Sequence, residues 1–278
     1  MARPPILSNV KLTLRQEAGF GCCKCGNPII EYHHIIPLEI EQHNRPEDMM
    51  CLCPNHHTEI RVIRENEQRA IKSNPVNKGE NKVEGYLRIS QDVPIVRLGG
   101  NTFKKQGAIL KIDDEAIVSL NVSPEGNLSL SVRLYDESGR KVLEIIDNEW
   151  ATGDYLAWDI EYKLNFLKLR YKKGDIGLEI DARKIPIDLF GNLWFKSQNF
   201  LLEPTRILFD GVIRQTTFNN CEFVDTFLEV DTQEKNLKIK SERVPTVSLN
   251  QGAIRFGENG PSITGTGTIS GTGTISTN

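Results

Sequence analysis

Apolar and β-branched residues occur in short runs through most of the chain after residue 107. Polar turn sequences such as Asp-Asp, Pro-Glu-Gly-Asn and Lys-Lys-Gly-Asp separate these runs at intervals of about ten residues. The runs lie at 108–112, 116–122, 128–135, 143–146, 166–171 and 177–180. This spacing predicts an all-β region, either a β-sandwich or a β-solenoid, which periodicity alone does not distinguish.

Two local patterns favour the solenoid. Residues 218–223, Phe-Asn-Asn-Cys-Glu-Phe, resemble one rung with small polar corners, and Ile263, Ile269 and Ile275 repeat every six residues. Residues 259–278 carry no charge and few apolar groups. We therefore expect this Gly/Thr-rich tail to be disordered unless it packs against another surface.

The first 75 residues carry helix and hairpin signals instead. Ser8 can cap a short helix that ends at about Gly19, residues 29–38 suit a short hairpin, and residues 55–73 suit a helix that ends before Pro75. The expected fold class is α+β, a small helix-containing domain followed by an all-β domain. Its expected parts are a domain at 1–74, a polar linker at 75–84, a β-rich domain at 85–258 and the tail at 259–278.

Composition changes the picture little. The chain has 34 basic and 37 acidic residues, a net charge of -3, so it lacks the cationic excess of many nucleic-acid-binding proteins. Its start shows no apolar signal segment, and no run of apolar residues is long enough to span a bilayer. We expect a cytoplasmic protein without membrane contact.

Cysteine and histidine residues are concentrated in one short region. Five of the six cysteines and all five histidines lie between positions 22 and 57. Cys22 and Cys25 form a Cys-x-x-Cys pair, and Cys53 and His56 form a Cys-x-x-His pair. Two such pairs predict a closed, four-coordinate structural Zn²⁺ site, whereas buried cysteines without a metal are the simpler alternative. Two further cysteines remain, of which Cys23 competes poorly for the metal and Cys51 is expected in the core.

The ordered series of Cys-x-x-Cys, Glu-Tyr-His-His-Ile-Ile-Pro at 31–37 and Leu-Cys-Pro-Asn-His-His at 52–57 resembles the HNH endonuclease family. The resemblance covers about residues 8–73 and implies a zinc-stapled ββα-metal nuclease domain. It implies that His33 and His57 hold a catalytic Mg²⁺ or Mn²⁺ ion and that His34 is the general base. The structural alternative is that one of His33 and His34 completes the zinc shell while the other is solvated.

The central Asn of the family is replaced here by Asp48, and Asn44 lies too early in the loop. An ionised Asp only accepts hydrogen bonds, so Asp48 either still ties the loop together or weakens catalysis. His43 is expected in solvent. Several basic residues near the motifs can meet phosphates, although a solvated face is the simpler interpretation because acidic residues alternate with them. They are Lys11, Arg15, Arg61, Arg64, Arg69 and Lys72.

These features predict a metal-dependent HNH endonuclease that hydrolyses phosphodiester bonds, with DNA the favoured nucleic-acid partner and restriction or phage defence as a biological setting. The β-rich domain would serve in sensing, assembly or target recognition, with a homo-oligomer or a regulatory partner protein as further expectations. Two alternatives differ in class. One is a catalytically inactive zinc module that binds nucleic acid or a protein partner. The other is a β-rich scaffold that senses a ligand or oligomerises and thereby controls the nuclease.

Overall fold

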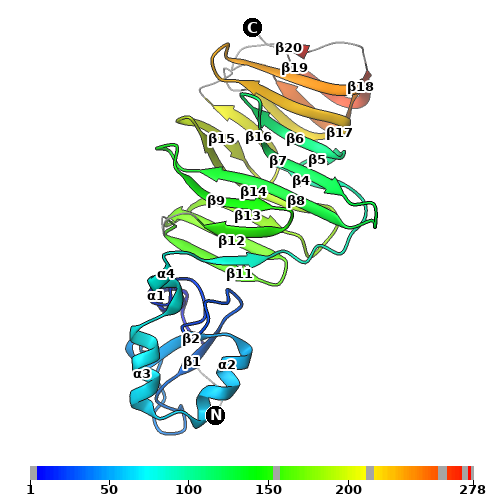
Figure 1. The fold of residues 1–278 in the computed structure, drawn as a ribbon. Helices are drawn as coiled ribbons and strands as arrows, with labels where there is room; N and C mark the ends of the chain where they lie inside the picture. Colours follow the sequence, from blue (N-terminus) through cyan, green and yellow to red (C-terminus); the bar gives the residue numbers. More distant parts are fainter. Residues whose placement is uncertain (1–4, 153–156, 211–215, 256–261, 271–274, 277–278) are drawn as a thin grey trace.

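The computed structural model describes residues 5–152, 157–210, 216–255, 262–270 and 275–276 (Figure 1). The helices lie at one end of the molecule, and the C-terminal strands lie at the other. Strands hold 50% of the residues and helices 15%, so the protein is mostly β.

The N-terminal part combines short helices with one hairpin. Its elements are α1 (Ser8–Glu17), β1 (Glu31–His34), the 3-10 turn η1 (Pro46–Asp48), β2 (Met49–Leu52), α2 (Pro54–Glu59), the 3-10 turn η2 (Ile60–Val62), α3 (Glu65–Ser73) and α4 (Val76–Glu80). Strand β1 pairs antiparallel with β2 and places His33 opposite Met50. Ser8 begins α1 but does not cap it, because the cap position is Leu7 and no side chain accepts a hydrogen bond there.

The single helix expected over 55–73 is interrupted. Ile63 and Arg64 have extended backbone, with ψ of 136° and 151°, and separate η2 from α3. The β-branched residues at this point lower helix propensity. The side chain of Gln68 donates to the carbonyl oxygens of Ile60 and Ile63 at 3.3 and 2.8 Å, and so satisfies acceptors that the break releases.

The remaining strands form one hydrogen-bonded system. They are β3 (Glu84–Tyr86), β4 (Ile95–Leu98), β5 (Asn101–Lys104), β6 (Gly107–Ile112), β7 (Glu115–Val122), β8 (Leu128–Tyr135), β9 (Lys141–Ile146), β10 (Glu149–Thr152), β11 (Asp159–Lys163), β12 (Phe166–Lys172), β13 (Asp175–Asp181), β14 (Ile187–Phe195), β15 (Gln198–Leu202), β16 (Arg206–Asp210), β17 (Thr216–Asp231), β18 (Asn236–Arg255), β19 (Ser262–Ser270) and β20 (Ile275–Ser276). Consecutive strands pair mostly antiparallel, while β14 pairs parallel with β4 and β17 pairs parallel with β5 and β6. The pairings close into a barrel.

The fold-class prediction is therefore wrong. The chain is mostly β, its helices are short, and its strands close into a barrel, so an α+β chain with a ββα-metal HNH domain and a sandwich or solenoid does not fit. Tight turns explain the outcome: Asp113 and Asp114 have φ of 47° and 67°, which folds β6 back antiparallel onto β7. A solenoid needs successive coils in parallel, and a sandwich leaves its sheets open.

Apolar side chains that alternate along the strands fill the barrel. Phe103 and Phe223 stack with ring centroids 4.4 Å apart, and Trp150 is 1% exposed. A separate apolar cluster lies under the β1–β2 hairpin and contains Met49, Met50 and Ile60. The two apolar clusters are therefore largely separate, and Phe20 is the residue of the N-terminal part that packs into the barrel cluster.

Polar contacts connect the two parts. In α4, which occupies part of the predicted linker, Asn77 is 4% exposed and donates to the carbonyl oxygens of Gly19 and Gly26 at 3.0 and 3.1 Å. Arg15 of α1 forms two hydrogen bonds with the carboxylate of Asp159 on β11, both 2.8 Å long. The Asn77 bonds therefore hold the predicted linker against the N-terminal part, and the Arg15 bonds join α1 to the barrel.

The predicted tail contributes strands where it is described. Strand β19 pairs antiparallel with β18, and β20 pairs with the other part of β18. Residues 259–261, 271–274 and 277–278 of this predicted segment lie outside the described residues. In the described part of the chain, no helix has the length and apolar character needed to cross a membrane.

Candidate metal centre and histidine site

Four side chains from two loops converge beside the β1–β2 hairpin. The ligand atoms of Cys22, Cys25, Cys53 and His56 all lie within 4.8 Å of one another. The Cys22 sulfur is 3.4 Å from His56 Nδ1, and the sulfurs of Cys25 and Cys53 are 3.9 Å apart. Zinc–ligand distances of about 2.0–2.3 Å in a tetrahedral site imply ligand separations of about 3.3–3.8 Å. The group can therefore hold a metal ion such as zinc.

Local backbone geometry presents these ligands. The amide of Gly26 donates to the Cys22 carbonyl at 2.8 Å, which closes the first turn, and Gly26 has φ of 73°. A side chain there would also collide with Asn77. Cys53 is the residue before α2, and Pro54 starts the helix with the φ that it needs, so His56 follows one turn later on the same side.

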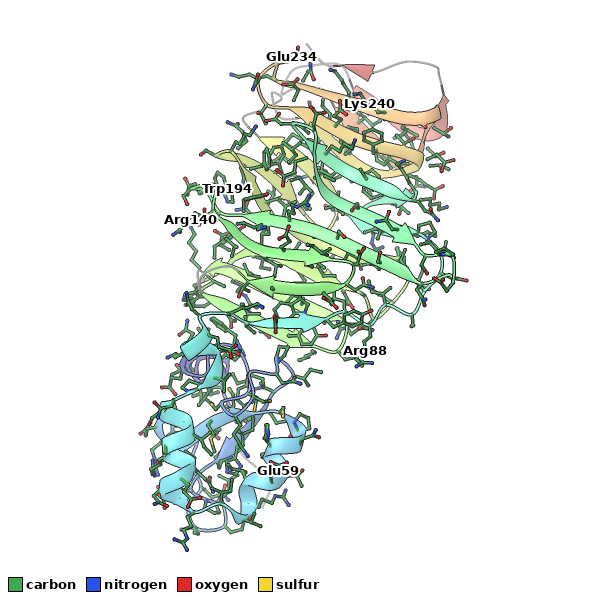
Figure 2. The ribbon with its side chains drawn as sticks, viewed as in Figure 1. Glu59, Arg88, Arg140, Trp194, Glu234 and Lys240 are labelled. Carbon is green, nitrogen blue, oxygen red and sulfur yellow. The ribbon has the colours of Figure 1, made fainter. Side chains whose placement is uncertain are left out.

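Neighbouring groups support this donor set. His56 Nε2 lies 3.8 Å from a Glu59 carboxylate oxygen, and Lys24 Nζ lies 3.3 Å from the same oxygen. Figure 2 labels Glu59, the last residue of α2. A carboxylate near the second nitrogen of a ligating imidazole is a common support in metal sites.

The other two cysteines of this region lie in the core. Cys23 and Cys51 are 2% and 0% exposed, and the Cys23 amide donates to the Cys51 carbonyl at 2.9 Å. Burial raises the pKa of Cys23 to about 11 and that of Cys51 well above its ordinary value, so both thiols stay protonated. The expected core position of Cys51 is confirmed.

His33 and His57 meet edge to face on the hairpin. Their ring centroids are 5.2 Å apart, with His33 on β1 and His57 on α2. His33 Nε2 lies 3.0 Å from Gln68 Oε1, and His57 Nδ1 lies 2.5 Å from a Glu31 carboxylate oxygen. Since both partners are acceptors, these nitrogens donate, and His33 Nδ1 and His57 Nε2 are the ring nitrogens left to bind a metal.

Burial is the main reason that the pKa of His33 falls to about 4, although the hydrogen bond with Gln68 opposes this effect. Electrostatic interactions with His57, His34 and Arg61 lower the pKa further. His33 is therefore neutral at pH 7 and retains the lone pair that a metal ligand or a base requires.

His34 has different neighbours from those of His33. Its Nε2 lies 3.3 Å from Asn44 Oδ1, and its ring meets that of His43 with centroids 5.2 Å apart. Asn44 also donates to the Pro5 carbonyl at 3.3 Å, so its oxygen faces the imidazole. Because Asn44 Oδ1 accepts, this contact favours the tautomer of His34 that carries its proton on Nε2.

Two expectations for this loop need correction. His43 is 7% exposed and not solvated, because its Nε2 donates to the Ile36 carbonyl at 3.0 Å. Asn44 contacts His34 although its place in the sequence is early, because the loop folds back onto the end of β1. Spacing counted along a loop cannot show such a return.

Asp48 is 7% exposed, and its carboxylate accepts hydrogen bonds from Arg45 Nε and Arg69 at 2.8 and 2.9 Å. Its backbone carbonyl also accepts from Ile35 at 2.8 Å. These bonds tie the loop to both β1 and α3. Hydrogen bonds from Arg45 and then Arg69 hold the pKa of Asp48 below its usual value, so the carboxylate is ionised.

His33 and His57 thus meet at the hairpin, His34 follows His33 on β1 but contacts Asn44 and His43, and Asp48 accepts hydrogen bonds from two arginines. Glu31, Asn44 and Gln68 are the contacts that sequence reasoning missed. The contact of Glu31 could have been predicted from the sequence, because Glu31 precedes His33 by two positions on a strand and so lies on the same face. Gln68 lies 35 residues from His33, and no sequence pattern indicates their contact.

Comparisons with known proteins identify no relative. No protein-family model, curated protein or solved structure matches the chain. We call Cys22, Cys25, Cys53 and His56 the Cys22 group. Within the described residues, it is the one cluster in which three or more His, Cys, Asp or Glu side chains can share an ion. An ion between His33 and His57 would therefore have at most these two histidine ligands, and its remaining positions would be open to water and phosphate.

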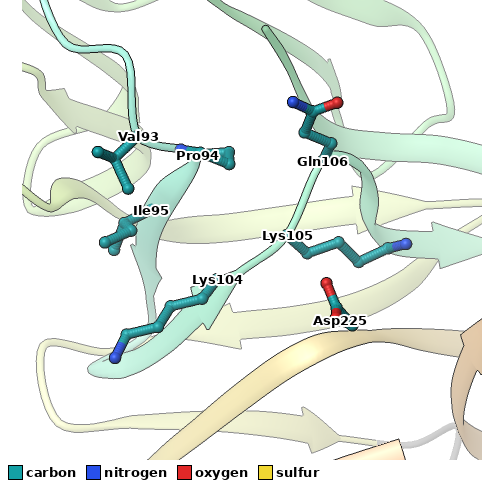
Figure 3. A pocket seen from close by; sticks show the side chains of 7 residues that line it. All are labelled: Val93, Pro94, Ile95, Lys104, Lys105, Gln106 and Asp225. Atoms are coloured by element: carbon teal, nitrogen blue, oxygen red, sulfur yellow. The ribbon is translucent and has the colours of Figure 1, made fainter. Parts of the chain in front are cut away.

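A pocket on the barrel is less suited to catalysis than the histidine site, because its cationic side chains already have partners. This pocket, of about 400 Å³, is lined by Lys104, Lys105 and Asp225 among others (Figure 3). Lys104 forms an ion pair with Glu222 at 2.7 Å, and Lys105 lies over the ring of Phe227. These cations are therefore engaged within the barrel.

Proposed function

We propose that this protein is a metal-dependent endonuclease that hydrolyses phosphodiester bonds, with DNA as its favoured substrate. The observation that carries the proposal is the meeting of His33 and His57, whose outer nitrogens are fixed by Gln68 and Glu31. Imidazoles held in this way, with lone pairs on the opposite nitrogens, are typical of metal ligands.

The histidines divide the chemistry between them. His33 and His57 would hold one Mg²⁺ or Mn²⁺ ion, which supplies charge to bind the scissile phosphate and to stabilise the leaving oxygen. His34 lies on the adjacent position of β1 and contacts a different set of residues, so its Nδ1 is the atom proposed to accept the proton from the attacking water. The hydrogen bond with Asn44 would orient that imidazole.

Zinc in the Cys22 group would have a structural role. Its four protein ligands leave no position for substrate, as in closed structural sites, and it would connect the start of α2 to the N-terminal loop. Free thiols also suit a reducing compartment, so we propose a cytoplasmic location. The resemblance of the motifs to HNH endonucleases supports the assignment of roles, without extending to the fold.

A catalytically inactive module that binds nucleic acid is the second candidate. The observation that favours it is Asp48, which stands where the resembling family has Asn and which is held by Arg45 and Arg69 away from the histidines. In either case the barrel would restrain, assemble or target the hairpin through the contact between Arg15 and Asp159.

The test is nicking of supercoiled plasmid by the full chain, with Mg²⁺ or Mn²⁺ added and zinc content measured in the same samples. We expect His57→Ala to lose nicking while retaining its zinc, since His57 is outside the Cys22 group. Nicking that persists in His57→Ala contradicts the proposed ion site. Metal-independent DNA binding without nicking by the wild type favours the second candidate.

A further inference from the structure

The break between α2 and α3 forms an exposed tip beside the histidines. Val62 is 90% exposed, the highest value among the large apolar side chains that the structure describes. Arg61 and Arg64 on either side of it are exposed as well. At this exposure Val62 buries little apolar area, so it contributes little to holding the fold.

The two arginines differ from most cations around them. In the described part of the N-terminal region, Arg15, Arg45, Arg69, Lys24 and Lys72 each have a carboxylate oxygen within 4.0 Å. Arg61 and Arg64 form no such ion pair among the residues described. Their charge is therefore available to an external anion. Arg61 also lies near enough to His33 for its charge to act on that imidazole.

One buried side chain connects the tip to the histidine site. Gln68, 7% exposed, donates to the carbonyls of Ile60 and Ile63, and its oxygen accepts from His33 Nε2. The tip and the proposed metal ligand are thus held in one hydrogen-bonded unit. A phosphate backbone bound by Arg61 and Arg64 would therefore be held by the same unit that holds His33.

We infer that Arg61, Val62 and Arg64 form a contact element for double-stranded DNA, in which the arginines bind backbone phosphates and Val62 enters the minor groove. Apolar side chains flanked by basic ones enter the minor groove in this way in other proteins. Val62 has no aromatic ring on which an unpaired base could stack, so a single strand is a poorer fit. The inference rests on the proposed function, because it assigns the substrate-binding part of the same site.

The test is equilibrium binding of the full chain to a fluorescent DNA duplex, without Mg²⁺ or Mn²⁺, over a range of salt concentrations. Each phosphate contact contributes about 0.9 to the slope of log affinity against log salt. The double variant Arg61→Ala/Arg64→Ala should therefore lower the slope by about 1.8 and the low-salt affinity by at least about tenfold. Val62→Ala should weaken duplex binding severalfold and leave the slope unchanged.

Lys78→Ala is the matched control, because Lys78 is an exposed cation on α4 at the opposite end of the N-terminal part from the tip. It should bind as the wild type does, and zinc content confirms that each variant is folded. An unchanged slope in the double variant overturns the inference while leaving hydrolysis possible. A lowered slope in a protein that never nicks DNA supports the inference and overturns the proposed function. A wild-type protein that does not bind duplex at low salt overturns the inference, and tighter binding to single strands overturns the duplex assignment; plasmid nicking with the added ion tests the proposed function separately.

Discussion

The buried ion pair between Arg15 and Asp159 makes a quantitative prediction about how the two parts of the molecule are joined. The guanidinium and the carboxylate are 8% and 2% exposed and are bound in a bidentate manner at 2.8 Å. Burial opposes the charge of Arg15, but the hydrogen bonds with Asp159 and Tyr32 outweigh it and raise the pKa of Arg15. Asp159 also accepts from Arg170 at 2.7 Å.

Removing one charge leaves the other buried. Asp159→Asn should lower the free energy of unfolding by about 3–5 kcal/mol, because both Arg15 and Arg170 lose a charged partner. Arg15→Met should cost less, since Arg170 still neutralises Asp159. The double variant Arg15→Met/Asp159→Asn should cost clearly less than the sum of the two single changes, with a coupling of about 1–3 kcal/mol.

The assay is urea unfolding followed by circular dichroism, together with limited proteolysis between residues 75 and 84. Arg97→Met is the control within the barrel strands, because Arg97 also binds an aspartate, Asp188, through two hydrogen bonds, although its side chain is 37% exposed. It should destabilise the protein without exposing the 75–84 segment to protease. Additive single changes, or a loss below about 1 kcal/mol in Asp159→Asn, would refute the reasoning.

Three further predictions concern the metal centre and the loops. Cys53→Ser should lose the zinc and the helical circular dichroism of the N-terminal part while the barrel stays folded, because the two apolar cores are separate; metal analysis and spectra check this. Gln68→Leu should lower the free energy of unfolding by about 1–3 kcal/mol and weaken Mn²⁺ binding, since buried carbonyl groups and His33 lose their partner; calorimetry measures both. Arg45 and Arg69 lower the pKa of Asp48, so its contribution to stability is present above about pH 3.9 and is lost as the pH falls through the folded pKa. Asp48→Asn should remove this part of the acid destabilisation in unfolding curves measured over a series of pH values, and an unaltered pH dependence would contradict it.

Local features of this chain were predictable from its sequence. The spacing of Cys22, Cys25, Cys53 and His56 brings the four ligands together because each pair spans one tight turn. Likewise, apolar residues that alternate along strands such as β8 predicted strands with one buried face. Both signals depend on residues only a few positions apart, so they can be recognised in the sequence before the fold is known.

Long-range pairing was not predictable. The barrel depends on contacts such as those of β17 with β5, where Phe223 lies opposite Phe103. Turns that recur about every ten residues are compatible with several architectures and do not predict such pairings. The pairing of Arg15 with Asp159 across 144 residues also has no local signal. Arg15 was expected on a solvated face, and its burial follows from the barrel that closes over it.

The most direct test of the central claim is the rate of plasmid nicking by His34→Ala at saturating Mg²⁺ or Mn²⁺, relative to the wild type. If His34 is the general base, the variant should retain its zinc and its affinity for DNA and should nick about 10²–10⁴-fold more slowly. A variant that nicks at the wild-type rate, with the same metal dependence, would show that the histidine site described above does not carry out the hydrolysis.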